Sequence, residues 1–203
     1  MKIGIMGGTF DPIHNGHLML GEAARDNFCL DRVWFMPNGN PPHKMRHTIE
    51  SSIEDRINMV KLAIETREKF TLQLYEANKR EISYSYSTLE FFLRQYPDDI
   101  FYFIIGADSL FAIETWNHPR RIFKSCIILA AFRDAVNTRA EMEDRIQYLT
   151  ERYQAHIELL ETPLLDISSH ELRERVKEGD SIASYVPAPV DKYIRANHLY
   201  RRD

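Results

Sequence analysis

Apolar runs bounded by turn residues recur along the chain, and stretches with helical spacing of apolar residues lie between them. The runs that predict strands are Lys2–Met6, Arg32–Pro37, Phe70–Tyr75, Ile100–Gly106, Cys126–Phe132 and Ile157–Leu160. The helical sets are Leu20/Ala23/Ala24/Phe28, Ile53/Ile57/Val60/Ile64, Leu89/Phe92/Leu93/Tyr96 and Met142/Ile146/Leu149. Strands that alternate with helices form parallel sheets covered on both faces. We therefore predict an α/β fold, a Rossmann-like, doubly wound and mainly parallel sheet with helices on both faces.

The chain of 203 residues suits one domain, residues 1–203, because it shows no linker, repeat or low-complexity run. The stretch from Asn38 to about Ile49 is the longest irregular segment, and loops of that length in compact domains are more often functional than idle. Near the C-terminus, Pro187–Leu199 predicts a short helix with Val190 and Ile194 facing inward and His198 as a further candidate for that face.

Composition excludes several classes of protein. A formal charge of −4 argues against a nonspecific nucleic-acid binder, so no nucleic-acid partner is expected. No apolar run reaches the roughly 20 residues of a membrane span, and the N-terminus lacks the pattern of a signal peptide. A cytoplasmic enzyme without a membrane partner is the expectation. Cys29 and Cys126 are too few for a disulfide framework or a four-cysteine zinc site, and we expect reduced core thiols.

The most informative segment follows the first predicted strand and reads GGTFDPIHNGHL, from Gly7 to Leu18. Glycines permit positive φ and close backbone approach, and a following helix N-terminus adds its positive dipole end, so an anion such as a phosphate can bind there. His14 and His17 stand three residues apart, which places both imidazoles on one face of the first helical turn. The chain contains neither GxxxxGK[ST] nor GxGxxG, the commoner phosphate motifs.

This segment resembles the HxGH nucleotidyltransferase superfamily, and the full string resembles the signature of bacterial nicotinate-nucleotide adenylyltransferases. HxGH alone is shared by several enzyme groups, whereas the longer match is specific. The resemblance implies that the two histidines are catalytic and that residues of the glycine turn bind ATP. The ATP-binding residues that it implies here are Gly7, Gly8, Thr9 and Phe10.

A second motif, LDISSHELRER from Leu165 to Arg175, follows the last predicted strand and begins another helix. Ser168 and Glu171 have the spacing of a capping box, which is compatible with phosphate binding because a capped helix still presents amides. The segment resembles the family element [IV]SSTxIR, which implies that Ser168 and Ser169 bind ATP and that Arg173 is catalytic. His170 stands where the family has Thr or Ser, which puts a hydroxyl contact at that position in doubt.

Other matches to the family lie between the two motifs. The element PPHK implies a catalytic Lys44, although a solvated loop lysine would look the same, and the element at Gly106 and Asp108 implies ATP contacts. For the nicotinate nucleotide the resemblance implies Tyr84, Ser85, Trp116 and Arg133. Trp116 also suits the pyridinium ring physically, because an indole face attracts a cation by roughly 0.5 to 2 kcal/mol. Arg133 equally suits a solvated strand end, and Trp34 lies inside a predicted buried strand and is expected in the core.

The resemblance implies adenylyl transfer from ATP to nicotinate mononucleotide, giving deamido-NAD and pyrophosphate in NAD biosynthesis, with Mg²⁺ arriving with ATP. The closest alternative is the same chemistry on nicotinamide mononucleotide or another phosphate substrate. A sensor that binds a metal or nucleotide through His14, His17, His43 and His47 is a different class, but no carboxylate or cysteine completes either histidine pair. The sequence leaves the oligomeric state open, and a homo-oligomer is compatible with it.

Overall fold

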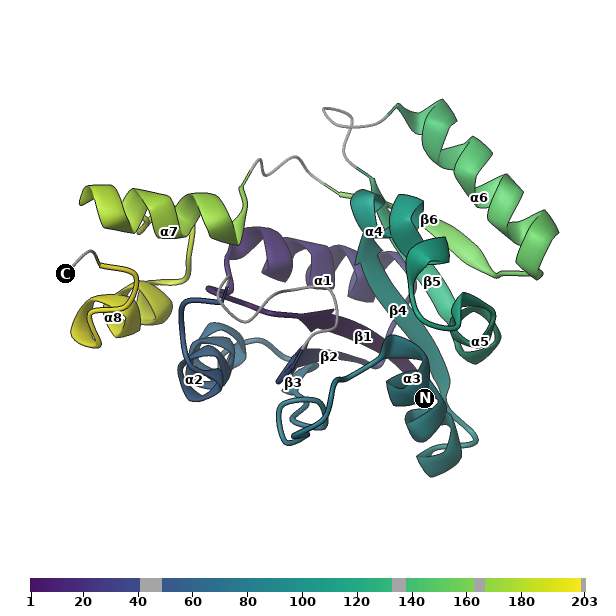
Figure 1. The fold of residues 1–203 in the computed structure, drawn as a ribbon, viewed down its shortest axis with the longest axis horizontal. Helices are drawn as coiled ribbons and strands as arrows, with labels where there is room; N and C mark the ends of the chain where they lie inside the picture. The colour runs from purple at the N-terminus through teal and green to yellow at the C-terminus, as the bar shows by residue number, and fades with distance from the viewer. Residues whose placement is uncertain (41–48, 133–137, 163–166, 202–203) are drawn as a thin grey trace.

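The computed structural model describes residues 1–40, 49–132, 138–162 and 167–201. In this part of the chain six strands form one parallel sheet in the order β3-β2-β1-β4-β5-β6 (Figure 1). The strands are β1 (Lys2–Gly8), β2 (Arg32–Pro37), β3 (Phe70–Leu72), β4 (Ile100–Gly106), β5 (Ile127–Phe132) and β6 (Ile157–Glu161). The predicted α/β fold is confirmed. The strand order reverses between β1 and β4, where open sheets of this kind bind their ligands at the carboxyl ends of the strands.

The connections between strands are helical, as predicted, and helices also follow β6. They are α1 (Asn15–Asn27), α2 (Ile53–Ile64), α3 (Ser85–Gln95), α4 (Ala107–Ala112), η2 (Ile113–Thr115), α5 (Pro119–Ser125), α6 (Arg139–Tyr153), α7 (Ser169–Glu178) and α8 (Ala188–Ala196). The sequence patterns missed α4, η2 and α5. These helices have only six, three and seven residues, so an apolar spacing has no room to repeat.

The core lies on both faces of the sheet because side chains alternate along each strand. On β4, Phe101, Phe103 and Ile105 pack with the apolar residues of α3, α4, α5 and α6, whereas Tyr102 and Ile104 pack on the opposite face with those of α1, α2, α7 and α8. In Figure 1, α7 and α8 lie together at one end of the molecule and α6 lies at the other. Trp34, exposed by 7 %, is a core residue as predicted.

The C-terminal helix confirms part of its prediction. Val190 and Ile194 are buried in the core. His198 is exposed and takes a left-handed φ of 52°, because α8 ends before it and its side chain no longer follows the helical face.

The prediction for Cys29 is also wrong. Cys29 follows the end of α1 in a left-handed turn with φ of 52° and is exposed. Cys126 is partly buried, and burial raises the pKa of its thiol to about 12, which keeps it protonated.

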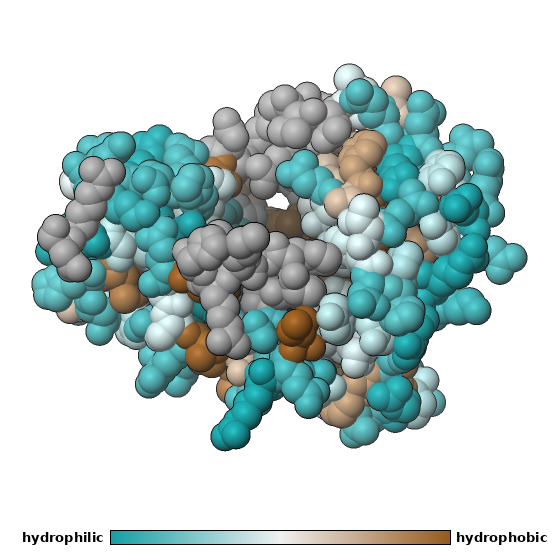
Figure 2. All heavy atoms as spheres, viewed as in Figure 1, coloured by the Kyte–Doolittle hydropathy of each residue, from teal (hydrophilic) through white to brown (hydrophobic). Residues whose placement is uncertain are grey.

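The visible surface is mostly hydrophilic, with isolated apolar residues and a hollow near its centre (Figure 2). Within the described residues no helix is both long enough and apolar enough to cross a bilayer.

Candidate functional site

The first motif lies at the carboxyl end of β1, beside the point where strand order reverses. Gly7 and Gly8 belong to the strand itself, and the left-handed residue of the turn is Phe10, with φ of 51°. The expectation that the glycines supply positive φ is therefore wrong. Gly8 is needed for a different reason, because a Cβ there would lie 3.0 Å from the ring of Phe10.

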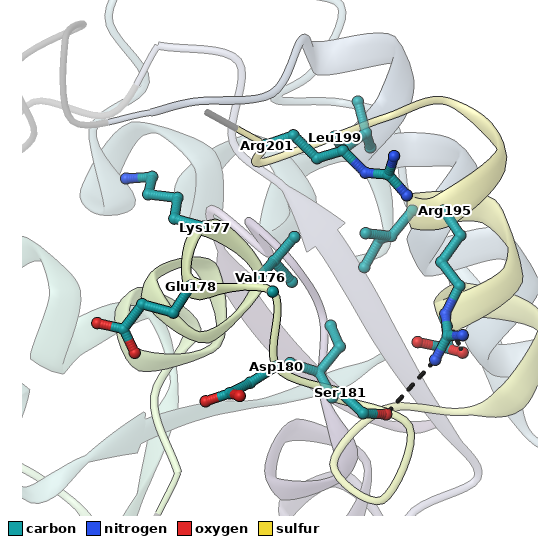
Figure 3. A pocket seen from close by; sticks show the side chains of 12 residues that line it. Val176, Lys177, Glu178, Asp180, Ser181, Arg195, Leu199 and Arg201 are labelled. Carbon is teal, nitrogen blue, oxygen red and sulfur yellow. Dashed lines mark hydrogen bonds and ion pairs between the residues drawn. The ribbon is translucent and has the colours of Figure 1, made fainter. Parts of the chain in front are cut away.

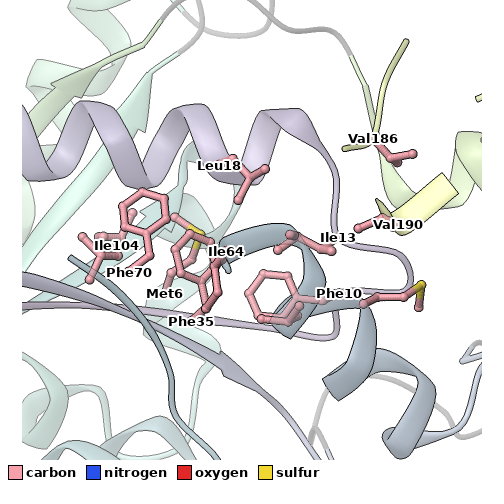
Figure 4. Close-up of a cluster of buried hydrophobic side chains, with 14 of the residues drawn as sticks. Met6, Phe10, Ile13, Leu18, Phe35, Ile64, Phe70, Ile104, Val186 and Val190 are labelled. Carbon is pink, nitrogen blue, oxygen red and sulfur yellow. The ribbon is translucent and has the colours of Figure 1, made fainter. Parts of the chain in front are cut away.

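Phe10 and Ile13 anchor this turn in the core. Figure 4 shows both side chains pointing into the apolar cluster that lies under α1. The ring of Phe10 is 2 % exposed and meets the imidazole of His17 edge-on, with 5.0 Å between ring centroids. Phe10 was predicted to bind ATP. The structure places its side chain in the core, so the contact it can offer to a nucleotide is through its backbone.

The two histidines lie together at the start of α1. His14 is the N-cap residue, and its ring centroid is 3.7 Å from that of His17. The backbone N–H of His14 donates to Nδ1 of His17 at 3.2 Å, so this nitrogen is an acceptor and the ring proton of a neutral His17 lies on Nε2. A Cβ at Gly16 would lie 3.0 Å from the His14 ring, which explains a glycine between the histidines.

A buried carboxylate ties the first motif to distant segments. Asp11 is 2 % exposed and accepts hydrogen bonds from the backbone N–H of Glu50 at 2.8 Å, from the hydroxyl of Tyr200 at 2.7 Å, and from the hydroxyl of Ser51. Nη1 of Arg173 lies 4.0 Å from the same carboxylate. We call these residues, Asp11, Glu50, Ser51, Arg173 and Tyr200, the Asp11 cluster.

The Asp11 cluster brings the second motif against the first. Arg173, exposed by 7 %, donates from Nη1 to the backbone oxygen of Asp11 at 2.9 Å and from Nε to Glu50 at 3.0 Å. Ser169 donates from its hydroxyl to the backbone oxygen of Pro12 at 2.9 Å. These bonds span up to 162 residues of sequence. The two motifs, predicted to share one site, are thus joined directly.

The start of α7 has half of the predicted capping box, the bond to the N-cap hydroxyl, while the carboxylate of Glu171 accepts from Arg175. The hydroxyl of Ser168 accepts from the backbone N–H of Glu171 at 3.1 Å, and Glu171 lies in the first helical turn. Further along the helix, Lys177 donates to Glu50 at 2.9 Å. Burial alone would raise the pKa of Glu50, but hydrogen bonds from Lys177 and Arg173 outweigh that effect and lower this pKa.

Arg56 of α2 fixes the ends of two neighbouring strands. Its Nη1 donates to the backbone oxygens of Thr9 and Asn38, each at 2.8 Å, although the side chain belongs to a residue only 2 % exposed. Burial lowers the pKa of this guanidinium. Thr9 is a predicted ATP contact, and its backbone carbonyl accepts a hydrogen bond from this buried cation.

A small pocket of about 120 Å³ opens beside Gly7. It joins three predicted residues from separate parts of the chain, Gly7, Ser85 and Trp116. Trp116, at the end of η2, is partly buried and meets Phe103 of β4 edge-on, with ring centroids 6.3 Å apart. Because this pocket also contains the buried acid Glu76, we call it the Glu76 pocket.

Sequence reasoning missed Glu76, which is 4 % exposed. Its carboxyl oxygens accept from the hydroxyl of Thr88 at 2.7 Å and from the side-chain amide of Asn38 at 3.1 Å. Burial raises the pKa of Glu76, while Thr88, Asn38 and the charge of Lys79 act in the lowering direction. An acid directly after a predicted strand, Phe70–Tyr75, was the signal that could have identified it.

The N-terminus of α3 faces the same pocket. Tyr84 is its N-cap residue, with no side-chain hydrogen bond to the cap, and Ser85 begins the helix. Ser83, immediately before, is 3 % exposed, and its hydroxyl oxygen has no hydrogen-bond partner among the described residues. The pocket thus combines a helix N-terminus with an unsatisfied hydroxyl, and both favour a polar or anionic ligand group.

The remaining predicted residues divide into two groups. Gly106 ends β4 with open space around it, and Asp108 is exposed in the first turn of α4, at the same edge of the sheet as Gly7. Lys44 and Arg133 lie outside the described residues.

No group of three or more metal-ligating side chains forms within the described part of the chain.

A larger hollow of about 480 Å³ lies between α7 and α8 (Figure 3). Three of its charged side chains are paired within the protein, Lys177 with Glu174 and Glu50, and Arg195 with Asp191. None of the predicted site residues that the structure describes lines it. The smaller pocket is lined by three of them, Gly7, Ser85 and Trp116, whereas His14, His17 and Arg173 line neither cavity.

Comparisons with known proteins identify the family and the fold of the chain. A family model described as cytidylyltransferase-like matches residues 5–175. A relative from Lachnoclostridium phytofermentans, named probable nicotinate-nucleotide adenylyltransferase, is 42% identical over 98% of each chain. One of the same name from Clostridium kluyveri is 40% identical over 99% of this chain and 100% of its own. A solved structure of Plasmodium falciparum nicotinic acid mononucleotide adenylyltransferase complexed with NaAD has a TM-score of 0.78 at 22% identity, covering 98% of this chain and 97% of that one. At this identity the match shows the shared fold.

Proposed function

The chain belongs to the nicotinate-nucleotide adenylyltransferases of the cytidylyltransferase-like family, and we propose that it transfers the adenylyl group of ATP to nicotinate mononucleotide. A phosphate oxygen of the nicotinate nucleotide attacks the α-phosphorus of ATP. The bond from that phosphorus to the oxygen that bridges it to the β-phosphorus breaks, pyrophosphate leaves, and deamido-NAD forms.

The protein needs no general base for this reaction. The attacking phosphate has a second pKa of about 6 and is largely ionised at neutral pH. Catalysis then depends on holding two phosphates in line and on stabilising the charge that develops on the α-phosphate and the leaving pyrophosphate. Both tasks require fixed donors at the carboxyl edge of the sheet.

The phosphate end of the site is assigned to the two joined motifs. We assign a phosphate contact to Nε2 of His17, the nitrogen that carries the proton of the neutral ring when Nδ1 accepts from the backbone N–H of His14. The N-termini of α1 and α7 contribute their dipoles, and the Asp11 cluster fixes the guanidinium of Arg173 beside the loop. His14 and the sequence-predicted Lys44 complete the catalytic set. Backbone and hydroxyl contacts to ATP are assigned to Gly7, Gly8, Thr9, Phe10, Gly106, Asp108, Ser168 and Ser169.

The Glu76 pocket is assigned to the pyridine ring. The indole of Trp116 offers a face to the positively charged ring, and the first amides of α3, at Ser85, offer donors to the ring's carboxylate. Tyr84 caps the same helix, and Arg133 keeps its sequence-based assignment to this substrate.

Mg²⁺ would accompany ATP and offset phosphate charge. The described residues gather no cage of carboxylates, so the phosphate oxygens and water would supply most of its ligands, as is usual for this ion.

The observation that supports this function most is that Trp116, Ser85 and Gly7 line one pocket. Gly7 belongs to the first of the two motifs, which are joined to each other by hydrogen bonds. The test is pyrophosphate release from Mg²⁺-ATP with either nicotinate or nicotinamide mononucleotide. We expect release with the nicotinate nucleotide at a kcat/KM at least tenfold higher than with the amide. No release with either nucleotide would reject the proposal.

A further inference from the structure

The adenylyl-transfer chemistry leaves one buried acid without a role. Within the described residues, Glu76 is the one ionisable side chain in the lining of its pocket. The rest of that lining is uncharged, with Ile5 and Gly7 from β1, Met36 from β2 and Phe103 from β4. A carboxyl group in such surroundings is the strongest local influence on any charged substituent that enters.

We propose that Glu76 determines whether the pocket accepts a carboxylate or a carboxamide on the pyridine ring. A neutral Glu76 admits the nicotinate carboxylate, whereas an ionised Glu76 repels it and accepts an N–H from the carboxamide. This inference rests on the proposed function and specifies the substrate selectivity of that same site.

The hydrogen bonds of Glu76 place it close to the substituent. Its carboxyl is 2.7 Å from the hydroxyl of Thr88, which lies three residues after Ser85 on α3. Thr88 therefore lies about one helical turn, or about 5 Å along the axis, from the helix N-terminus assigned to the nicotinate carboxylate, and Glu76 lines the same pocket as Ser85. At that range, in a partly buried site, two like charges change relative affinity by on the order of tenfold or more.

Among the described residues, the hydrogen bonds that Glu76 accepts come from neutral side chains. Burial raises the pKa of Glu76, and the amide of Asn38 and hydroxyl of Thr88 offset this only in part. In the part of the chain that the structure describes, the one cation acting on it is Lys79, whose Nζ lies 4.0 Å from the ring centroid of Tyr75. Since the Thr88 hydroxyl can donate or accept, either protonation state of Glu76 can be satisfied.

The sign of the effect follows directly. As pH rises, more Glu76 ionises, so the preference for nicotinate over nicotinamide should fall. An ionised Glu76 also attracts the pyridinium ring, but this attraction is common to both nucleotides and cancels in their ratio. The substrate phosphate, with a second pKa of about 6, cancels in the same way.

The experiment measures the ratio of kcat/KM for nicotinate and nicotinamide mononucleotides from about pH 5, just above the ordinary glutamate pKa, to about pH 9. Three proteins are compared: the wild type, Glu76→Gln, and Glu81→Gln as a matched control at an exposed acid in the same segment. We expect the ratio to fall about tenfold or more in the wild type and in Glu81→Gln, and to stay constant and high in Glu76→Gln.

A wild-type ratio that does not change with pH would overturn the inference, even if Glu76→Gln failed to fold. An equal slope in Glu76→Gln and wild type would also overturn it. Both results differ from failure of the proposed function, in which neither nucleotide supports pyrophosphate release and no ratio exists.

Discussion

Each end of the site buries a carboxyl group, and the two are surrounded differently. Asp11 receives three hydrogen bonds and lies near the cation of Arg173, while Glu76 receives two hydrogen bonds from neutral side chains. A buried carboxylate that is paired with a cation and accepts several hydrogen bonds stays ionised, because its donors and the cation would lose their partner if it lost its charge. A buried carboxyl with neutral, rotatable partners can change its charge at lower cost. The first arrangement suits a rigid phosphate end, and the second suits recognition of a substituent.

The largest expected effect compares isosteric substitutions at the two acids. Asp11→Asn should lower the free energy of unfolding by about 3 to 5 kcal/mol, because the new amide points donors at neighbours that themselves donate. Glu76→Gln should lower it by less than about 1 kcal/mol, since Thr88 and Asn38 can exchange donor and acceptor roles. Urea denaturation measures both, with Asp144→Asn as an exposed control. Equal losses at the two positions would remove the distinction.

The next effect tests whether the phosphate end carries the catalysis. His17→Ala should lower kcat by about 100-fold or more, equivalent to about 2.7 kcal/mol, because it removes a donor that stabilises developing charge. The KM for the nicotinate nucleotide should change little. Steady-state kinetics measures both, and His156→Ala, at an exposed histidine, should leave kcat unchanged. A near-normal kcat in His17→Ala would place the phosphates elsewhere.

A smaller effect belongs to the Glu76 pocket. Trp116→Ala should raise the KM for the nicotinate nucleotide by about 2- to 30-fold, the equivalent of 0.5 to 2 kcal/mol of cation–π attraction, and leave the KM for ATP almost unchanged. Trp116→Phe should recover part of the loss because it keeps an aromatic face. If the two KM values rose together, the indole would be supporting the fold instead of the ring.

The sequence predicted most of the fold, and it identified the motifs of the candidate site, because both depend on local patterns. Strands such as 100–106 appear as continuous apolar runs, and the motifs at His14 and Arg173 are contiguous strings. The contacts that organise the site are not local. The hydroxyl of Tyr200 donates a hydrogen bond to Asp11, 189 residues earlier in the chain, and no pattern in the sequence predicts such a contact. Glu76 stands directly after a predicted strand, which makes it a candidate, but only the folded chain shows that it is buried against Thr88 and Asn38.

The smallest effect distinguishes the two ends by the sign of a pH dependence. Glu50, in the Asp11 cluster, has a lowered pKa in the folded protein, so its contribution to stability is present above the ordinary glutamate pKa of about 4.3 and disappears as pH falls. Glu76 has a raised pKa, so the folded state keeps its proton longer than the unfolded state, and stability is lost as pH rises above about 4.3. Relative to wild type, Glu50→Gln should therefore become less stable as pH increases, and Glu76→Gln more stable. Urea denaturation of the three proteins from about pH 4 to about pH 8 measures how the free energy of unfolding of each variant, relative to wild type, changes with pH. If this difference changed in the same direction for both variants, the two acids would not differ in the way that their surroundings predict.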